Sequence, residues 1–108
     1  MLHARLHLAQ LDSDGEPMPL RHGDLVVVAR AESPELDWEV VAHTIDPHHV
    51  SPGHHDLSMS CVHGVEEDGR LRFVDLSGSA FLVRSVQNAV VFRGSSPLAG
   101  FDMQLLVS

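Results

Sequence analysis

The sequence contains no lysine and no tyrosine, only one cysteine, and no long apolar run. Without lysine, the chain cannot form a Schiff base or supply the lysine of a Walker-type phosphate-binding loop. Its single cysteine, Cys61, cannot form an internal disulfide, which favours a reducing, cytoplasmic setting. No apolar stretch approaches the roughly 20 residues that span a membrane, and the first eight residues lack the apolar core of a signal peptide. We therefore expect a soluble, intracellular protein.

Basic residues are also scarce. Seven arginines stand against 15 acidic residues, so the formal net charge is −8. This balance argues against nucleic acid or an anionic membrane surface as the main partner. The nine histidines count as neutral in this sum, and their protonation could bring the charge from −8 to about +1. We therefore hypothesise that assembly or loop conformation changes between about pH 7.5 and 5.5.

A length of 108 residues fits one domain, residues 1–108. Apolar and polar residues alternate through most of the chain, a pattern typical of strands. Turn-forming residues such as Asp68-Gly69, Ser77-Gly78-Ser79 and Gln87-Asn88 interrupt the alternation. The expected strands cover residues 2–8, 25–29, 38–45, 57–63, 71–76, 80–86, 89–93 and 101–107, with a short helical turn over 33–36 as an open alternative. About eight short, mostly antiparallel strands predict an all-β domain that forms a β-sandwich or small barrel.

Histidines concentrate in one loop. His48, His49, His54 and His55 lie between Pro47 and Asp56, and His63 follows on the next expected strand. Neutral imidazole suits zinc, nickel or copper. The spacing matches no metal-binding motif, however, and neighbours in an extended chain point to opposite sides. A polar surface loop is the simpler interpretation. If a divalent transition metal is bound, the candidate ligands are His49, His54 and His63.

Three other residues are candidates for ligand binding. Arg84 and Arg93 each interrupt an otherwise apolar strand. An arginine in such a place either pairs across the sheet or lines a pocket that takes an anionic ligand. Trp38 is the only tryptophan, and it serves either as a core anchor or as the aromatic wall of a pocket. We take Trp38, Arg84 and Arg93 as the predicted ligand-binding residues.

No catalytic motif is evident. The stretch Gly94-Ser95-Ser96-Pro97-Leu98 does not complete a G-x-S-x-G nucleophile motif. Cys61 alternates with apolar residues in mid-strand, which predicts a buried thiol. An enzyme is therefore the less favoured interpretation.

The strands after Leu76 are apolar on both faces, which is more apolar surface than one small core can bury. This predicts that a second copy or another partner covers part of it, as a homodimer or a larger oligomer. The sequence thus favours a small binding or oligomerisation module, for a small molecule or a protein. A metal-binding protein that uses the histidine loop is the alternative.

Overall fold

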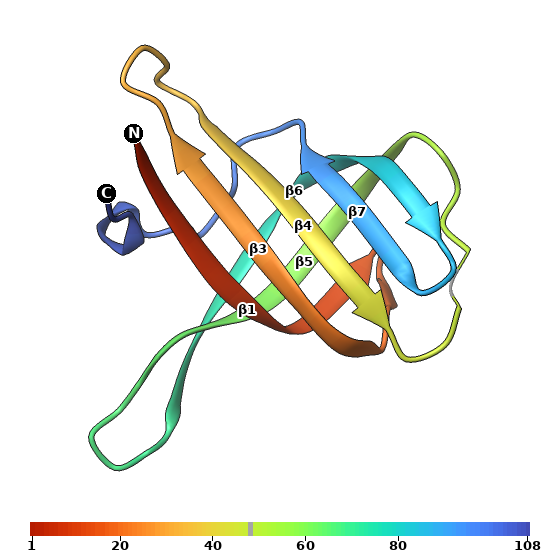
Figure 1. Cartoon of the computed structure of the whole chain (residues 1–108), viewed down its shortest axis with the longest axis horizontal. Helices are drawn as coiled ribbons and strands as arrows, with labels where there is room; N and C mark the ends of the chain where they lie inside the picture. Colours follow the sequence, from red (N-terminus) through yellow and green to blue (C-terminus); the bar gives the residue numbers. More distant parts are fainter. Residues whose placement is uncertain (48) are drawn as a thin grey trace.

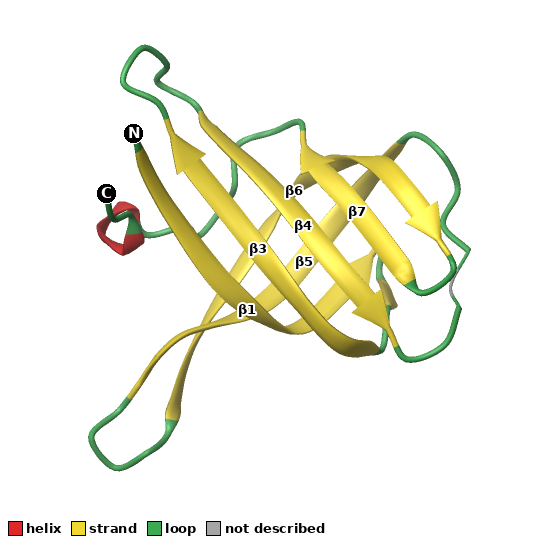
Figure 2. Cartoon of the chain, in the orientation of Figure 1, coloured by secondary structure: helices red, strands yellow, loops and turns green. Residues whose placement is uncertain are grey.

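Nearly all of the regular structure is strand, as Figure 2 shows. The computed structural model describes residues 1–47 and 49–108. The all-β domain that the alternating pattern predicts is confirmed. The elements in chain order are β1 (Leu2–Ser13), β2 (Glu16–Pro17), β3 (Leu20–Ala29), β4 (Leu36–Thr44), β5 (His54–Val65), β6 (Leu71–Val86), β7 (Ala89–Gly94) and a single 3-10 turn, η1 (Met103–Leu105).

Six of the strands close into an antiparallel barrel (Figure 1). Their order is β1-β3-β4-β7-β6-β5, and β5 pairs back with β1. Strand β1 makes this closure possible because its first half pairs with β3 and its second half with β5. The register shifts between Leu8 and Gln10, where β1 passes from one partner to the other. Strand β2 only extends the end of β1. Of the two predicted architectures, the small barrel is the one adopted.

The core is built from alternate residues of every barrel strand. On β4 these are Trp38, Val40 and Ala42, and on β5 they are Leu57, Met59 and Cys61, as the alternation predicts. Phe92 on β7 is the largest side chain that is completely buried. The run 25–29 is apolar on both faces. Its inward residues enter this core, and its outward valines remain partly exposed.

Strand β6 corrects one prediction. Residues 71–76 and 80–86 were expected to form two strands separated at Ser77-Gly78-Ser79, but they form one strand of 16 residues. Gly78 continues the strand and makes room for the indole of Trp38. A Cβ at Gly78 would lie 2.7 Å from Trp38 Cζ2. The glycine thus marks a close approach of a side chain rather than a turn.

The C-terminal segment corrects a second prediction. Residues 101–107 alternate, yet they form η1 and one isolated bridge between His3 and Val107 instead of a strand. The carboxylate of Asp102 accepts a hydrogen bond from the Gln104 N–H at 2.9 Å, and this cap favours the turn. The helical turn that was left open over 33–36 does not form either; the chain bends there and β4 begins at Leu36.

The molecule is flattened, with extents of 39 × 35 × 20 Å. The two termini lie near each other at one end, and the β5–β6 hairpin projects beyond the barrel (Figure 1). This hairpin carries exposed apolar side chains at Val65, Leu71 and Phe73. Among the described residues, no helix has the length and apolar character needed to cross a membrane.

Candidate binding face

Arg84 and Arg93 share one outer face of the barrel. In the register of β6 and β7, Arg84 pairs with Val91 and Phe81 pairs with Arg93. Paired residues on adjacent strands lie on the same side of a sheet, as do residues two apart along a strand. Arg84 and Arg93 are therefore separated by about 7 Å along the strands and one strand spacing of about 5 Å. The structure brings these two predicted binding residues together.

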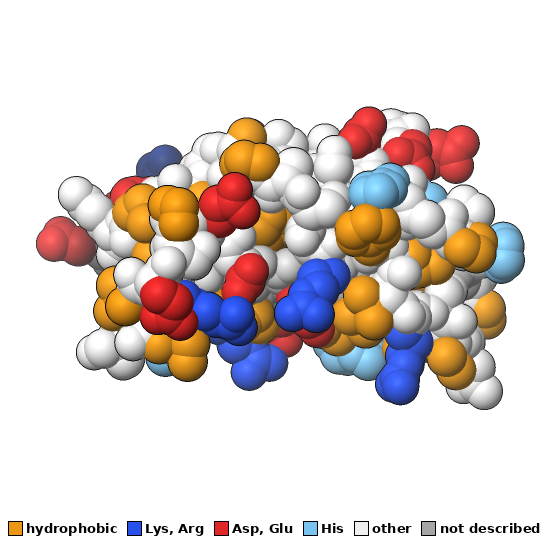
Figure 3. Space-filling model, turned by 90° about the horizontal axis from the view of Figure 1, so that it is seen from above, with side chains coloured by type: hydrophobic (Ala, Val, Ile, Leu, Met, Phe, Trp, Pro, Cys, Tyr) orange, Lys and Arg blue, Asp and Glu red, His pale blue; other side chains and the backbone are white. Residues whose placement is uncertain are grey.

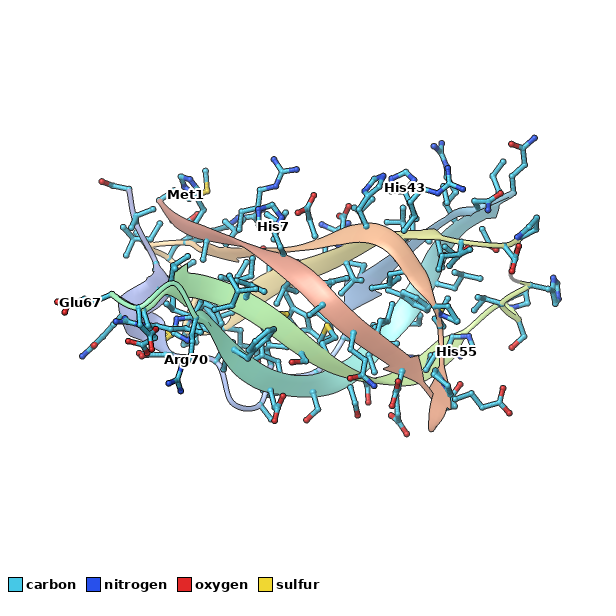
Figure 4. All side chains as sticks on the ribbon, turned by 90° about the horizontal axis from the view of Figure 1, so that it is seen from below. Met1, His7, His43, His55, Glu67 and Arg70 are labelled. Carbon is cyan, nitrogen blue, oxygen red and sulfur yellow. The ribbon has the colours of Figure 1, made fainter. Side chains whose placement is uncertain are left out.

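This surface continues across β4, β3 and the first half of β1. We call it the front face; its outward residues include His3, Arg5, His7, His22, Asp24, Val26, Val28, Asp37, Glu39, Val41, His43, Phe81, Arg84, Val91 and Arg93. Figure 4 shows His7 and His43 on the same side of the molecule. In Figure 3 the front face forms the lower edge, and arginine side chains gather along it.

The arginines of the front face differ in how they are paired. Arg5 donates a hydrogen bond to Asp24 at 2.8 Å, and this contact holds the pKa of that carboxyl below its ordinary value. Elsewhere, Arg30, Arg70 and Arg72 also form ion pairs. In contrast, no carboxylate of the described residues lies within 4.0 Å of the Arg84 or Arg93 side-chain nitrogens. Glu39 is directly opposite Arg93 in the register of β4 and β7, but among the described residues no ion pair within 4.0 Å joins them.

Histidines surround these arginines. The rings of His22 and His43 stack with centroids 4.2 Å apart, and the ring of His54 lies over Phe81 at 3.8 Å. Acidic residues lie on both sides of the barrel: Asp24, Asp37 and Glu39 belong to the front face. Asp12, Asp56 and Asp75 lie on the other side, on β1, β5 and β6. Figure 4 shows many nitrogen-tipped side chains, with some oxygen-tipped ones among them, along the edge that carries His7 and His43, and mostly oxygen-tipped ones along the other. The front face therefore combines three arginines and four histidines with acidic residues, although the overall charge is −8.

Trp38 lies inside the barrel rather than on the front face. It is 2 % exposed, and its Nε1–H donates to the Ser96 carbonyl oxygen at 2.8 Å. A Cβ at Gly94 would lie 2.2 Å from Trp38 Cε2, so the indole rests directly on the end of β7. Trp38 thus anchors the strand end that carries Arg93 and the segment that follows it.

The three predicted metal ligands are not brought together. His49 is exposed in the loop before β5, whereas His54 and His63 lie on β5 nine residues apart, which is about 30 Å along an extended strand. His48 lies outside the described residues. Within residues 1–47 and 49–108, no group of three His, Cys, Asp or Glu side chains could hold a metal ion.

A histidine that sequence reasoning did not select, His55, has the most constrained environment. It is 7 % exposed; its Nδ1 lies 2.6 Å from Asp14 Oδ2, and its Nε2 lies 2.6 Å from the Ser51 carbonyl oxygen. Both partners are acceptors, so both ring nitrogens must donate, and only the imidazolium form can do so. The alternation of Leu57, Met59 and Cys61, continued backwards, places His55 on the inward side and would have revealed it.

The electrostatics of His55 agree with this geometry. Burial lowers the pKa of His55, but the hydrogen bonds to the Ser51 carbonyl and the Asp14 carboxylate raise it by more, so the pKa lies above the ordinary 6.5. The Asp56 N–H and then His55 lower the pKa of Asp14. Because Nε2 is bonded to a backbone carbonyl, it cannot accept a proton from a nucleophile. The pair joins the loop before β5 to the β1–β2 turn and has no catalytic geometry.

Cys61 is equally unsuited to nucleophilic chemistry. It is fully buried, and burial, followed by the charge of Asp75, raises the pKa of its thiol to about 12. We expect a disulfide exchange reagent at pH 8 to modify Cys61 at least about 100-fold more slowly in the native protein than in urea. The release of the coloured thiolate measures both rates. Equal rates in the two states would show that the thiol is accessible in the fold.

We compared the chain with known protein families, with curated proteins and with solved structures, and none of the three comparisons found a match.

Proposed function

We propose that this protein is a non-catalytic binding module that uses its front face to hold an anionic group of a partner. Arg84 and Arg93 are the charged contacts in this proposal. Its main support is that both guanidinium groups are exposed on one surface and that no carboxylate oxygen of the described residues lies within 4.0 Å of either, although Glu39 is the neighbour of Arg93 across the strands. Guanidinium groups bind carboxylates through paired hydrogen bonds, and such contacts give both affinity and orientation.

The chemistry around these arginines favours a protein as the partner. Phe81, Val83 and Val86 on β6 are 45 %, 60 % and 56 % exposed, beside or between the arginines in the register. Apolar contacts next to charged ones are typical of protein interfaces. The net charge of −8 opposes long-range attraction to nucleic acid or an anionic membrane. A surface with acidic side chains fits best, and the acidic side of a second copy of this chain is one such surface.

A charge-matched pair of double variants tests this function. The probe is a fluorescent poly-L-glutamate peptide at low salt, and fluorescence anisotropy measures its binding. Arg84→Gln/Arg93→Gln should weaken binding about 10-fold, because two charge-assisted contacts are lost. Arg70→Gln/Arg72→Gln changes the net charge equally on the projecting hairpin and should have little effect. Equal losses in both variants, or no binding by the wild type, would overturn the proposal.

The same variants address self-association. If a second copy is the partner, the sedimentation coefficient of the wild type should rise with concentration, and the front-face variant should suppress this rise. We also place the module in the cytoplasm. The support for this location is that its only cysteine is a buried thiol without a disulfide partner in the sequence.

A further inference from the structure

A cavity of about 410 Å³ lies beside Trp38 at the barrel end. It is formed by the segment that leads into β4, the segment that follows β7, and the C-terminal segment. Figure 1 shows the first two along the upper edge of the barrel. This volume falls within the range of roughly 300–1,000 Å³ that is usual for small-ligand sites. The indole of Trp38 supports one wall from inside, through its bond to the Ser96 carbonyl.

Much of the cavity wall is apolar. Leu36, Leu98 and Phe101 line it and also pack against the core, so these walls are held in place. Met103 lines it too but is 58 % exposed, and it presents a flexible thioether at the entrance. An aliphatic chain or an aromatic ring placed here would remove apolar surface from water.

The charge at the cavity has one sign. Glu35 and Asp37 are the only charged residues in its lining, and both are acidic. Asp37 forms an ion pair with Arg30 at 3.1 Å. Glu35 has no cation of the described residues within 4.0 Å of its carboxylate. An apolar ligand with a positive group would therefore contact the apolar walls and form an ion pair with the Glu35 carboxylate.

We propose that this cavity binds an organic ammonium or guanidinium group carried on an apolar chain or ring. Neither Arg84 nor Arg93 lines the site, although Arg93 precedes the lining residue Gly94 in β7. The site also has the opposite charge preference, so it does not depend on the proposed function. The same chemistry is offered by a free amine and by a lysine or arginine side chain next to an apolar residue in a peptide.

The methionines supply a direct test. NMR of the chain labelled with ¹³C at the methionine methyl groups gives four reporters, of which Met103 lines the cavity while Met18 and Met59 are buried elsewhere. Phenethylammonium should shift the Met103 signal in a saturable manner and leave Met18 and Met59 unchanged. Neutral phenethyl alcohol should bind at least about 5-fold more weakly, and the anion hydrocinnamate more weakly still. Equal affinity for all three probes, or no shift at Met103, would overturn the proposal.

A peptide probe distinguishes the two sources of the cation. Acetyl-Leu-Lys-amide presents an apolar side chain next to an ammonium group. Tighter binding of this peptide than of phenethylammonium identifies a protein segment as the ligand, whereas tighter binding of the amine identifies a small molecule. Both results support the site.

Matched variants assign the charge preference to one residue. Glu35→Gln should weaken binding of phenethylammonium about 3- to 10-fold and leave binding of the alcohol unchanged. Glu32→Gln removes an exposed acid of the same loop that does not line the cavity, and it should change neither. Equal losses in the two variants would overturn the assignment. Arg84→Gln/Arg93→Gln should retain amine binding, so a failure of the front-face proposal and a failure of this one are distinguishable.

Discussion

Replacement of Gly94 by alanine should lower the free energy of unfolding by about 3 kcal/mol, because the added methyl group has no space. Its Cβ would lie 2.2 to 2.4 Å from three atoms of the Trp38 indole. The indole has little room to move away, since Gly78 lies against it at a distance that excludes a Cβ and Ser96 holds its N–H. The backbone of β7 or the ring must shift, and either change disturbs the barrel end.

Gly64→Ala provides the matched control. Gly64 also lies in a strand, does not have positive φ, and would place its Cβ no closer than 3.7 Å to another residue outside its immediate neighbours, the Arg72 side chain. We expect this variant to stay within about 0.5 kcal/mol of the wild type. Urea denaturation followed by the fluorescence of the single tryptophan measures both free energies. Similar losses at the two positions would show that the indole does not fill the space at Gly94.

The contact between Trp38 and the two glycines also explains why the predicted break in β6 is wrong. Alternation correctly identified the inward residues of β4 and β5, because the interior of a barrel imposes a period of two. Gly78 suggested a break, since glycine marks turns and close approaches alike. A turn and a close approach can be told apart only when the side chain that packs on the glycine is known. For Gly78 that side chain is Trp38, which lies 40 positions earlier in the chain.

The candidate site, like the fold, could be predicted only in part from the sequence. Arg84 and Arg93 stood out because each interrupts an apolar strand, but only the register shows that they share one face. Four histidines between Pro47 and Asp56 suggest one loop cluster, but His55 belongs to β5 and points inward. Its partner Asp14 lies 41 residues away, at a turn whose proximity to β5 depends on closure of the barrel.

The contribution of His55 to stability should decrease as the pH rises above neutrality. Because folding raises the pKa of His55, this contribution is complete below about 6.5, the value of an unfolded histidine, and is lost as the pH rises through the higher value of the folded protein. For Asp14, whose pKa folding lowers, the contribution is complete above 3.8 and is lost as the pH falls through the folded value. The pair therefore stabilises the fold most between about pH 4 and 6.5.

The variant His55→Gln isolates this contribution from the other histidines. It should be about 2 kcal/mol less stable than the wild type at pH 5.5, because a buried, charged hydrogen-bond donor is lost. The difference should shrink by at least half at pH 8.5. His54→Gln alters the exposed neighbour and should retain the pH dependence of the wild type. Urea denaturation at the two pH values measures all three proteins, and a difference that stays constant with pH would contradict the prediction.

The loop before β5 should also change its structure as the pH rises above neutrality. A neutral imidazole has one N–H, so deprotonation of His55 removes its hydrogen bond to either Asp14 or the Ser51 carbonyl. Glu16 and His49 also line the hollow beside the pair. Side-chain ¹⁵N NMR should therefore show both nitrogens of His55 protonated at pH 5.5, and the methyl signals of buried Val50 should shift only as the pH rises past neutrality. A loop that changes on acidification instead would show that the second proton of His55 does not control this segment.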